Sequence, residues 1–271
     1  MKKRILSLVL IFTISGVCSG CGLEQARDDG PKSLTDSSKD VKEEAVDEEE
    51  ENYDDVKIEV VENASHSDEY NEAFEIGDRI GASYMRQGDA EVTEFESWQE
   101  GYKALIEDCN NDGYEHSYAL IYVDGDEIPE LVYKTYDNQV AIATFTGSTV
   151  NIFSSQLLDI QYIKGANNVI AHENIVADSA LNDYVVAIKD GFWVQIAYGT
   201  SRPMDIWAED SFDENGNPII SYWEINGEEL SSQDEYDEKL LKYIDTNSVT
   251  PGLENGGESY EAILAKIDSM K

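Results

Sequence analysis

The sequence predicts an α+β protein with a largely antiparallel meander sheet that is flanked by N-terminal and C-terminal helices. Three observations support this fold class. Apolar residues recur at helical spacing near both ends of the region 67–271, apolar and polar residues alternate through its middle, and turn residues divide the alternating stretch at short intervals. Short turns join antiparallel strands, and helices at the ends of a run of strands are typical of α+β folds.

Two helices are expected before the strands. The stronger one covers 94–107, where Thr93 and Glu96 have the spacing of a capping box. Its apolar stripe consists of Phe95, Trp98, Tyr102, Leu105 and Ile106. A weaker helix is expected over 68–87, where Gly77 and Gly81 lower the helical propensity.

A succession of short strands is expected next, and helices close the chain. The expected strands cover 118–122, 130–136, 139–146, 149–153, 160–163, 169–175, 184–189, 192–198, 204–208 and 218–225. Asp190-Gly191 has the composition of a tight hairpin turn. Ser232 is expected to cap a helix that runs to 244, and Ser259 a last helix.

The N-terminus has the features of a bacterial lipoprotein signal. Basic residues at 2–4 precede an apolar run at 5–17, which is shorter than the roughly 20 residues that span a bilayer. Ser19-Gly20-Cys21 resembles the lipobox, whose cysteine is acylated and becomes the new N-terminus. We therefore expect residues 1–20 to be a lipoprotein signal peptide and Cys21 to be the lipid attachment site. An ordinary signal peptide cleaved nearby is the alternative.

Composition divides the remaining chain into a linker and a globular region. Residues 21–66 are strongly acidic and poor in aromatic residues, so they are expected to form a disordered linker; an acidic docking tail is the alternative. Residues 67–271 have the apolar content of an α+β globular domain. The formal net charge of the whole chain is −38, which disfavours nucleic acid as a partner.

Two segments resemble a known group of proteins. The segment ALIYVDGDEIPELV at 119–132 resembles the "aLiDiDgDGipELi" strand-turn-strand segment of uncharacterised lipoproteins and secreted proteins of anaerobic Gram-positive bacteria. The segment YWEINGEE at 222–229 resembles their "yyiNGkevs.eey" ending. The resemblance implies an extracytoplasmic protein held to the cell membrane by its lipid, and it implies no particular activity.

The first of these segments also resembles the calcium loop of FG-GAP and VCBS repeats, which places Asp124, Asp126 and Glu130 as oxygen ligands for Ca²⁺. Tyr122 stands where that pattern has its first Asp, and Glu127 where it has the Gly of the sharp turn. We therefore expect the loop to serve mainly as a turn and the protein to need no cofactor, with Ca²⁺ binding as the alternative.

Large aromatic residues concentrate in the second half of the domain. Trp193, Tyr198, Trp207 and Trp223 are candidates for a binding face that stacks a sugar or grips a peptide, and core packing is the alternative. No catalytic residue stands out. We expect a non-enzymatic module of the cell envelope that binds an unknown ligand or partner protein. An envelope-associated carboxylate-based hydrolase is the alternative function.

Overall fold

The computed structural model describes residues 66–135, 139–154, 157–175, 179–205 and 207–270. The predicted signal peptide at 1–20 and Cys21 lie outside the described residues, as does the predicted linker up to residue 65. The described part of the chain contains two antiparallel sheets and four α-helices, so the predicted α+β fold class is confirmed. The strands divide between two sheets.

The first sheet has five strands in the order β1-β5-β4-β3-β2. Its strands are β1 (Ala82–Ser83), β2 (Tyr118–Ile121), β3 (Glu130–Lys134), β4 (Val140–Thr146) and β5 (Thr149–Ser154). From β2 to β5 each strand pairs antiparallel with the next, as the predicted meander requires. The short strand β1 pairs with β5 at one edge.

The second sheet has seven strands in the order β11-β10-β9-β8-β7-β6-β12. Its strands are β6 (Leu157–Ile163), β7 (Asn168–Ile175), β8 (Ala180–Lys189), β9 (Phe192–Arg202), β10 (Tyr222–Ile225), β11 (Glu228–Leu230) and β12 (Thr250–Pro251). The predicted hairpin at Asp190-Gly191 joins β8 to β9, where Lys189 pairs with Phe192. Strand β12, which comes from the far end of the domain, pairs with β6 at the opposite edge from β11.

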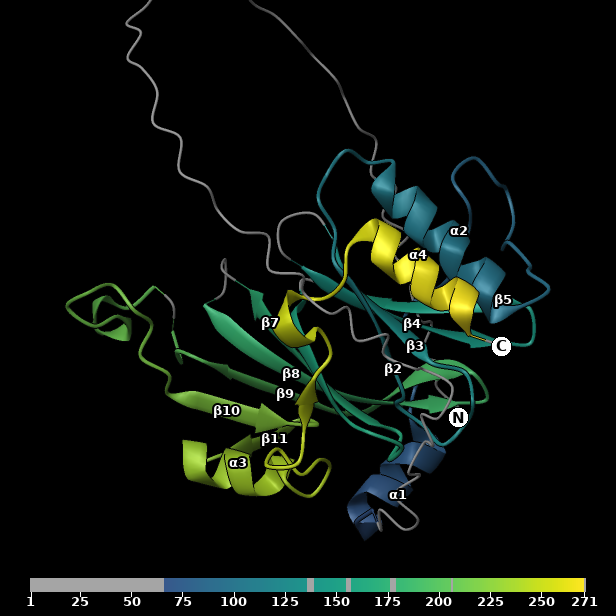
Figure 1. The fold of residues 1–271 in the computed structure, drawn as a ribbon. Coiled ribbons are helices and arrows are strands. Elements are labelled where there is room, and N and C mark those ends of the chain that lie inside the picture. Colours follow the sequence, from purple (N-terminus) through teal and green to yellow (C-terminus); the bar gives the residue numbers. More distant parts are fainter. Residues whose placement is uncertain (1–65, 136–138, 155–156, 176–178, 206, 271) are drawn as a thin grey trace, which may run out of the picture. The chain divides into compact units, whose positions relative to one another are not determined.

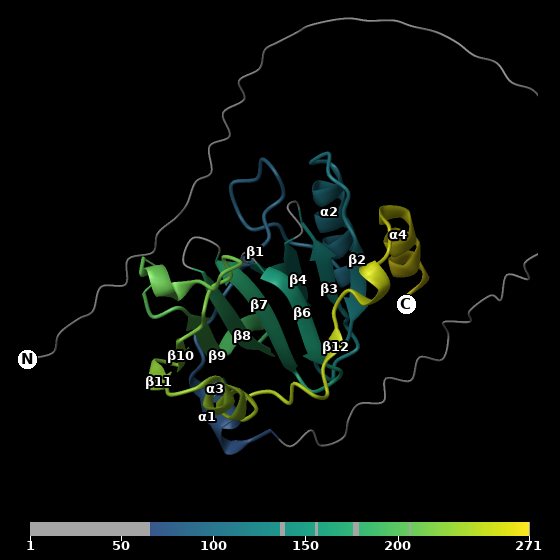
Figure 2. The ribbon, with the colours of Figure 1, turned by 90° about the vertical axis from the view of Figure 1, so that its left-hand side faces the viewer.

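The helices cover the outer faces of the two sheets (Figures 1 and 2). They are α1 (Asp68–Ile76), α2 (Trp98–Asn110), α3 (Gln233–Leu240) and α4 (Tyr260–Ser269). Helices α2 and α4 lie side by side on the five-stranded sheet, and their residues Tyr102, Ile106 and Ile263 belong to the buried cluster there. Helices α1 and α3 pack on the seven-stranded sheet, where Tyr70 and Tyr236 are buried. The domain is therefore layered helix, sheet, sheet, helix.

A third buried cluster lies between the sheets. It joins Ile142 and Phe153 of the five-stranded sheet to Val169, Val186 and Trp193 of the seven-stranded sheet. Apolar residues on both faces of the central strands explain why β4 reads as a nearly continuous apolar run in the sequence.

The segment 250–269 contacts both sheets. Strand β12 pairs with β6, and Glu258 exchanges two backbone hydrogen bonds with Tyr118 of β2. Helix α4 then packs beside α2. One segment therefore covers an edge strand of each sheet.

The predicted caps of the last two helices are confirmed. The side chain of Ser232 accepts a hydrogen bond from the Glu235 N–H, and that of Ser259 accepts one from the Ala262 N–H. The predicted start of the helix at 94 is wrong. Helix α2 begins at Trp98, and Ser97 is its N-cap.

Tertiary hydrogen bonds explain where the two N-terminal helices differ from the prediction. The Phe95 N–H donates to the Ser148 carbonyl, which keeps the chain before Ser97 out of the helix. The predicted helix over 68–87 stops at Ile76, because the chain then passes against β9. A Cβ at Gly77 would lie 2.7 Å from the Gln195 carbonyl oxygen, so that approach requires glycine.

The predicted strand at 204–208 is also wrong. The Asp205 carboxylate accepts a hydrogen bond from the Trp207 N–H at 2.9 Å, which forms a local turn that competes with strand pairing. The strand predicted at 218–225 begins only at Tyr222. The chain between β9 and β10 is therefore a long loop at the end of the seven-stranded sheet.

Candidate ligand-binding groove

The loop that contains Asp124, Asp126 and Glu130 is held by its own carboxylates. Asp124 Oδ1 accepts a hydrogen bond from the Asp126 N–H at 3.1 Å, and Asp126 Oδ1 accepts one from the Ile128 N–H at 2.8 Å. These are side-chain turns that satisfy backbone donors without a cation. Across the part of the chain that the structure describes, no group of three or more His, Cys, Asp or Glu side chains is arranged to hold a metal ion.

Glu130 points away from solvent and ties this loop to the sheet. Its carboxylate accepts hydrogen bonds from the Val123 N–H at 2.9 Å and from the Thr144 hydroxyl at 3.3 Å. The side chain is buried, and burial raises its pKa well above the usual value, with the Asp124 charge adding to the effect. Glu130 is therefore a buried acid whose hydrogen bonds hold the loop against the sheet.

The four candidate aromatic residues fall into three environments. Trp193 is fully buried between the sheets, and its indole N–H donates to the Asn151 carbonyl at 3.1 Å. Trp223 lies on the α3 face of the seven-stranded sheet, where its indole N–H donates to the Gln233 side chain at 2.8 Å. Burial therefore assigns Trp193 to core packing, and Trp223 is separated from the others by the sheet. Tyr198 and Trp207 alone of the four line a common groove.

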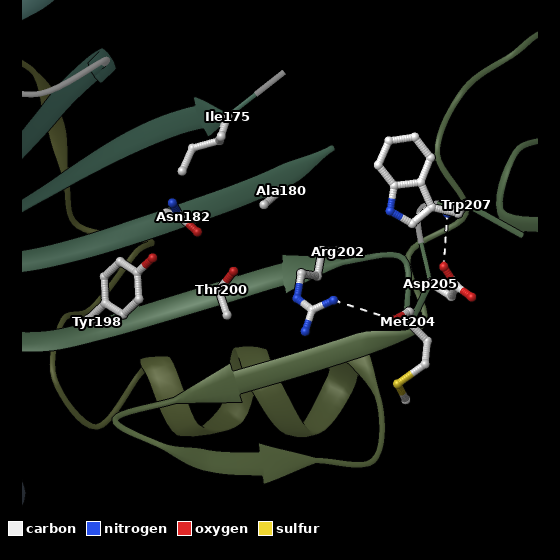
Figure 3. Close-up of a pocket in the computed structure, with 9 residues that line it drawn as sticks. All are labelled: Ile175, Ala180, Asn182, Tyr198, Thr200, Arg202, Met204, Asp205 and Trp207. Carbon is white, nitrogen blue, oxygen red and sulfur yellow. Dashed lines mark hydrogen bonds between the residues drawn. The ribbon is translucent and has the colours of Figure 1, made fainter. Parts of the chain in front are cut away.

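This groove lies at the end of the seven-stranded sheet and encloses about 510 Å³ (Figure 3). Its lining consists of Ile175, Ala180, Asn182, Tyr198, Thr200, Arg202, Met204, Asp205 and Trp207. Strands β7, β8 and β9 supply the floor, and the segment after β9 supplies the wall with Trp207. Small-molecule sites commonly have volumes of about 300–1,000 Å³ and combine aromatic surface with a few polar groups.

Register fixes the positions of the floor residues. Glu173 of β7 pairs with Asn182 of β8, Asn182 pairs with Thr200 of β9, and Thr200 pairs with Glu224 of β10. Directly paired residues point to the same face of a sheet, so these four side chains form one row across the strands. The Asn182 amide N–H donates to the Glu173 carboxylate at 2.8 Å, within this row.

Two polar groups of the groove have unused hydrogen-bonding capacity. Asn182 is 1% exposed, and its side-chain oxygen has no hydrogen-bond partner among the described residues. Arg202 makes no ion pair with any described residue, although acids far outnumber bases in this chain. Its Nη1 donates to the carbonyls of Pro203 and Met204, and its guanidinium lies 4.5 Å from the Tyr222 ring centroid. The other guanidinium donors form no hydrogen bond with a residue that the structure describes.

Aromatic rings continue the floor toward the core. The ring centroids of Phe153 and Tyr184 are 5.7 Å apart, and those of Tyr184 and Tyr198 are 5.0 Å apart. Burial raises the pKa of Tyr198, and the nearby charges of Glu173 and Glu224 raise it further. The Tyr198 hydroxyl is therefore protonated at neutral pH, and the Tyr184 hydroxyl lies within hydrogen-bonding reach of it.

The opposite face of the same strands is locked by a polar chain. A Cβ at Gly199 would lie 2.1 Å from the Tyr236 hydroxyl, so glycine leaves the space through which this tyrosine reaches β8. The Tyr236 hydroxyl donates to Asp183 at 2.5 Å, and the other Asp183 oxygen is 2.6 Å from Nδ1 of His172. The hydrogen bond to Asp183 raises the pKa of His172. Helix α3 therefore braces the strands that carry the groove.

Trp207 is the most exposed part of the groove. The residue is 88% exposed, and Met204, which also lines the groove, is 57% exposed. Figure 3 shows the Trp207 indole on the far side of the groove from Tyr198. The backbone N–H of Trp207 donates to the Asp205 carboxylate. The groove therefore has one aromatic ring in its wall and another on its floor.

Sequence reasoning missed most of the polar groove residues. The strand predicted at 184–189 begins after Asn182, and the strand predicted at 192–198 ends before Thr200 and Arg202. Hydrophobic alternation fades at these positions because the five-stranded sheet no longer covers the strands there. The alternation of polar side chains at 198, 200 and 202 is the sequence pattern that indicates a continued, uncovered strand.

Comparisons of the chain with protein-family models, with curated proteins and with solved structures found no match. Within the described ranges, no helix has the length and apolar character needed to cross a membrane. The fold and site define a two-sheet α+β domain with an open groove on one sheet. Its function is therefore inferred from the chemistry of that groove.

Proposed function

We propose that this protein is a lipid-anchored extracytoplasmic lipoprotein whose domain binds a ligand in the groove without transforming it. Trp207 carries this proposal, because this residue is 88% exposed beside a groove whose floor contains an unpartnered amide oxygen. A large aromatic side chain gains free energy when a ligand covers it. A buried acceptor without a partner costs about 1–3 kcal/mol, and a donor that reaches the Asn182 oxygen recovers this free energy.

The experiment measures whether material from the cell envelope covers Trp207. Envelope fractions from the producing bacterium are added to the purified protein, and quenching of tryptophan emission by acrylamide is followed. A neutral quencher is needed because the acidic protein repels anions. We expect one fraction to reduce the quenching of wild-type protein and to leave that of Trp207→Phe unchanged.

Leu181→Ala is the matched control for this experiment. Leu181 neighbours Asn182 on β8 but points to the other face of the sheet, and it is 46% exposed. This variant should retain the protection. If no fraction protects Trp207, or if a fraction reduces the quenching of Trp207→Phe as much as that of the wild type, the groove is not the binding site.

The spacing of the carboxylates in the row that crosses the groove floor favours binding over the alternative of a carboxylate-based hydrolase. Glu173 and Glu224 share one row but lie on β7 and β10, three strand spacings apart. At about 4.8 Å per spacing, their backbones are roughly 14 Å apart. Glycoside hydrolases hold their two carboxyl groups about 5–9.5 Å apart. Glu173 is also engaged by Asn182 at 2.8 Å and by the Tyr184 hydroxyl at 3.1 Å.

Anchoring through Cys21 is tested separately. Cys21→Ser removes the thiol that a lipid would modify, so the protein should appear in the medium or remain as an unprocessed precursor. Detergent phase partitioning and intact-protein mass spectrometry measure this. Unchanged partitioning into the detergent phase would contradict the proposed anchor. The expected partners are accordingly the membrane, through the lipid, and a ligand or protein of the envelope.

A further inference from the structure

We infer that the groove takes a neutral saccharide. This inference rests on the proposed function, because it names the chemical class of the ligand that the groove would bind. Three features of the groove support it: an open aromatic wall, a floor that presents both donors and acceptors, and a charge balance that disfavours anionic ligands.

The aromatic surface suits a ring that has an apolar face. The Trp207 indole is open to solvent on one side of the groove, and Tyr198 stands on the floor (Figure 3). A sugar ring presents C–H groups on its faces and hydroxyl groups around its rim. Its face can cover an indole while the rim meets polar side chains, as in sites that combine aromatic contact with a few polar groups.

The hydrogen-bonding groups of the floor suit hydroxyl groups. The Asn182 oxygen lacks a donor, whereas the Arg202 guanidinium has donors beyond the Nη1 that binds the carbonyls of Pro203 and Met204. Thr200 lies between them on β9 and supplies a hydroxyl. A hydroxyl group both donates and accepts, so adjacent sugar hydroxyls can satisfy the amide oxygen and the guanidinium together.

Charge decides between neutral and anionic ligands. Asp205 lines the groove, and Arg202 is the base among the lining residues. Glu173 and Glu224 lie in the same row of side chains as the floor residues Asn182 and Thr200. An anionic sugar would meet more negative than positive charge there, within a chain whose net charge is −38. A neutral ring avoids this repulsion and still uses the Arg202 donors.

The experiment titrates the purified protein calorimetrically with neutral oligosaccharides. The probes are oligomers of β-1,4-linked glucose, α-1,4-linked glucose and β-1,4-linked N-acetylglucosamine, with an oligomer of a uronic acid as the anionic comparison. We expect at least one neutral oligomer to bind and the uronic acid oligomer to bind more weakly. Trp207→Ala should weaken binding about tenfold or more, as loss of an aromatic anchor does.

Two further variants separate a groove contact from a general loss of structure. Thr200→Val keeps the side-chain shape and removes the hydroxyl, so it should weaken binding several-fold, to the extent of one lost hydrogen bond. Leu181→Ala, on the other face, should bind like the wild type. Unfolding curves of all three variants, measured in urea, establish that they are folded.

The outcomes distinguish this inference from the proposed function. An envelope fraction can protect Trp207 although no neutral oligomer binds. If periodate oxidation of that fraction leaves the protection intact, the ligand is not a saccharide, and the groove is still the binding site. Tighter binding of the uronic acid oligomer overturns the neutral preference. If no fraction protects Trp207, the proposed function itself fails.

Discussion

Replacing Trp193 by alanine should lower the free energy of unfolding by about 3–5 kcal/mol, as large-to-small changes of buried aromatic residues do. Trp193 has no exposed surface and fills the space between the two sheets. Its indole N–H also satisfies the Asn151 carbonyl, which the substitution would leave without this donor. Urea unfolding followed by circular dichroism measures the change.

Trp207→Ala is the matched control, since it removes the same side chain from an 88% exposed position. It should change stability by no more than about 0.5 kcal/mol. Equal effects of the two substitutions would contradict the assignment of Trp193 to the core and of Trp207 to the surface. The pair therefore tests the division of aromatic residues between packing and binding.

Replacing Glu130 by alanine should destabilise the protein by about 2–4 kcal/mol. The substitution leaves the buried Val123 N–H without its acceptor, removes the partner of Thr144 and opens a cavity. Glu130→Gln keeps the shape and an acceptor oxygen, so its effect should be much smaller. Urea unfolding of both variants checks this difference, and an equal loss in both would contradict the hydrogen-bonding role.

The difference in unfolding free energy between the wild type and Glu130→Gln should change with pH in one direction. The pKa of Glu130 is raised in the folded protein, so the folded state holds the proton more tightly than the unfolded state does. The stability that Glu130 contributes is greatest below its ordinary pKa of about 4.5 and is lost as the pH rises toward the raised pKa. Unfolding curves between pH 4.5 and neutrality should therefore show Glu130→Gln gaining stability relative to the wild type.

Thermal melting of the wild-type protein tests whether the loop at Asp124, Asp126 and Glu130 is only a turn or binds Ca²⁺. We expect millimolar Ca²⁺ and EDTA to give the same melting temperature. A bound cation at 100 times its dissociation constant would add about 2.7 kcal/mol. A rise of a few degrees that Asp126→Ala abolishes would overturn the assignment of the loop as a turn.

Much of the fold could be predicted from the sequence because local patterns agree with the final structure. The meander follows from alternating residues and short turns, and the caps at Ser232 and Ser259 follow from side chains that bind their own helices. The two-sheet arrangement could not be predicted in this way. Alternation indicates which face of a strand is buried, but it does not say against which sheet that face packs.

The helix start depends on a distant partner, whereas the loop after β9 departs from the predicted strand through a local turn at Asp205. The residues before Ser97 bond to Ser148, which is far away in the sequence, so the capping-box spacing at Thr93 was misleading. In the groove, Tyr198 and Trp207 could be singled out as large aromatic residues. Asn182 and Arg202 could not, because their importance comes from unused hydrogen-bonding groups that only the folded arrangement reveals.

The segment 250–269 affects how prone the chain is to aggregate while it folds. Each strand from β6 to β11 pairs with its neighbour in sequence, so most of both sheets can form from local contacts. Until β12 reaches β6 and Glu258 reaches β2, however, the β6 edge of one sheet and the β2 edge of the other stay uncovered. Open edges recruit strands from other molecules. The last segment to dock therefore sets how long a folding chain remains prone to aggregation.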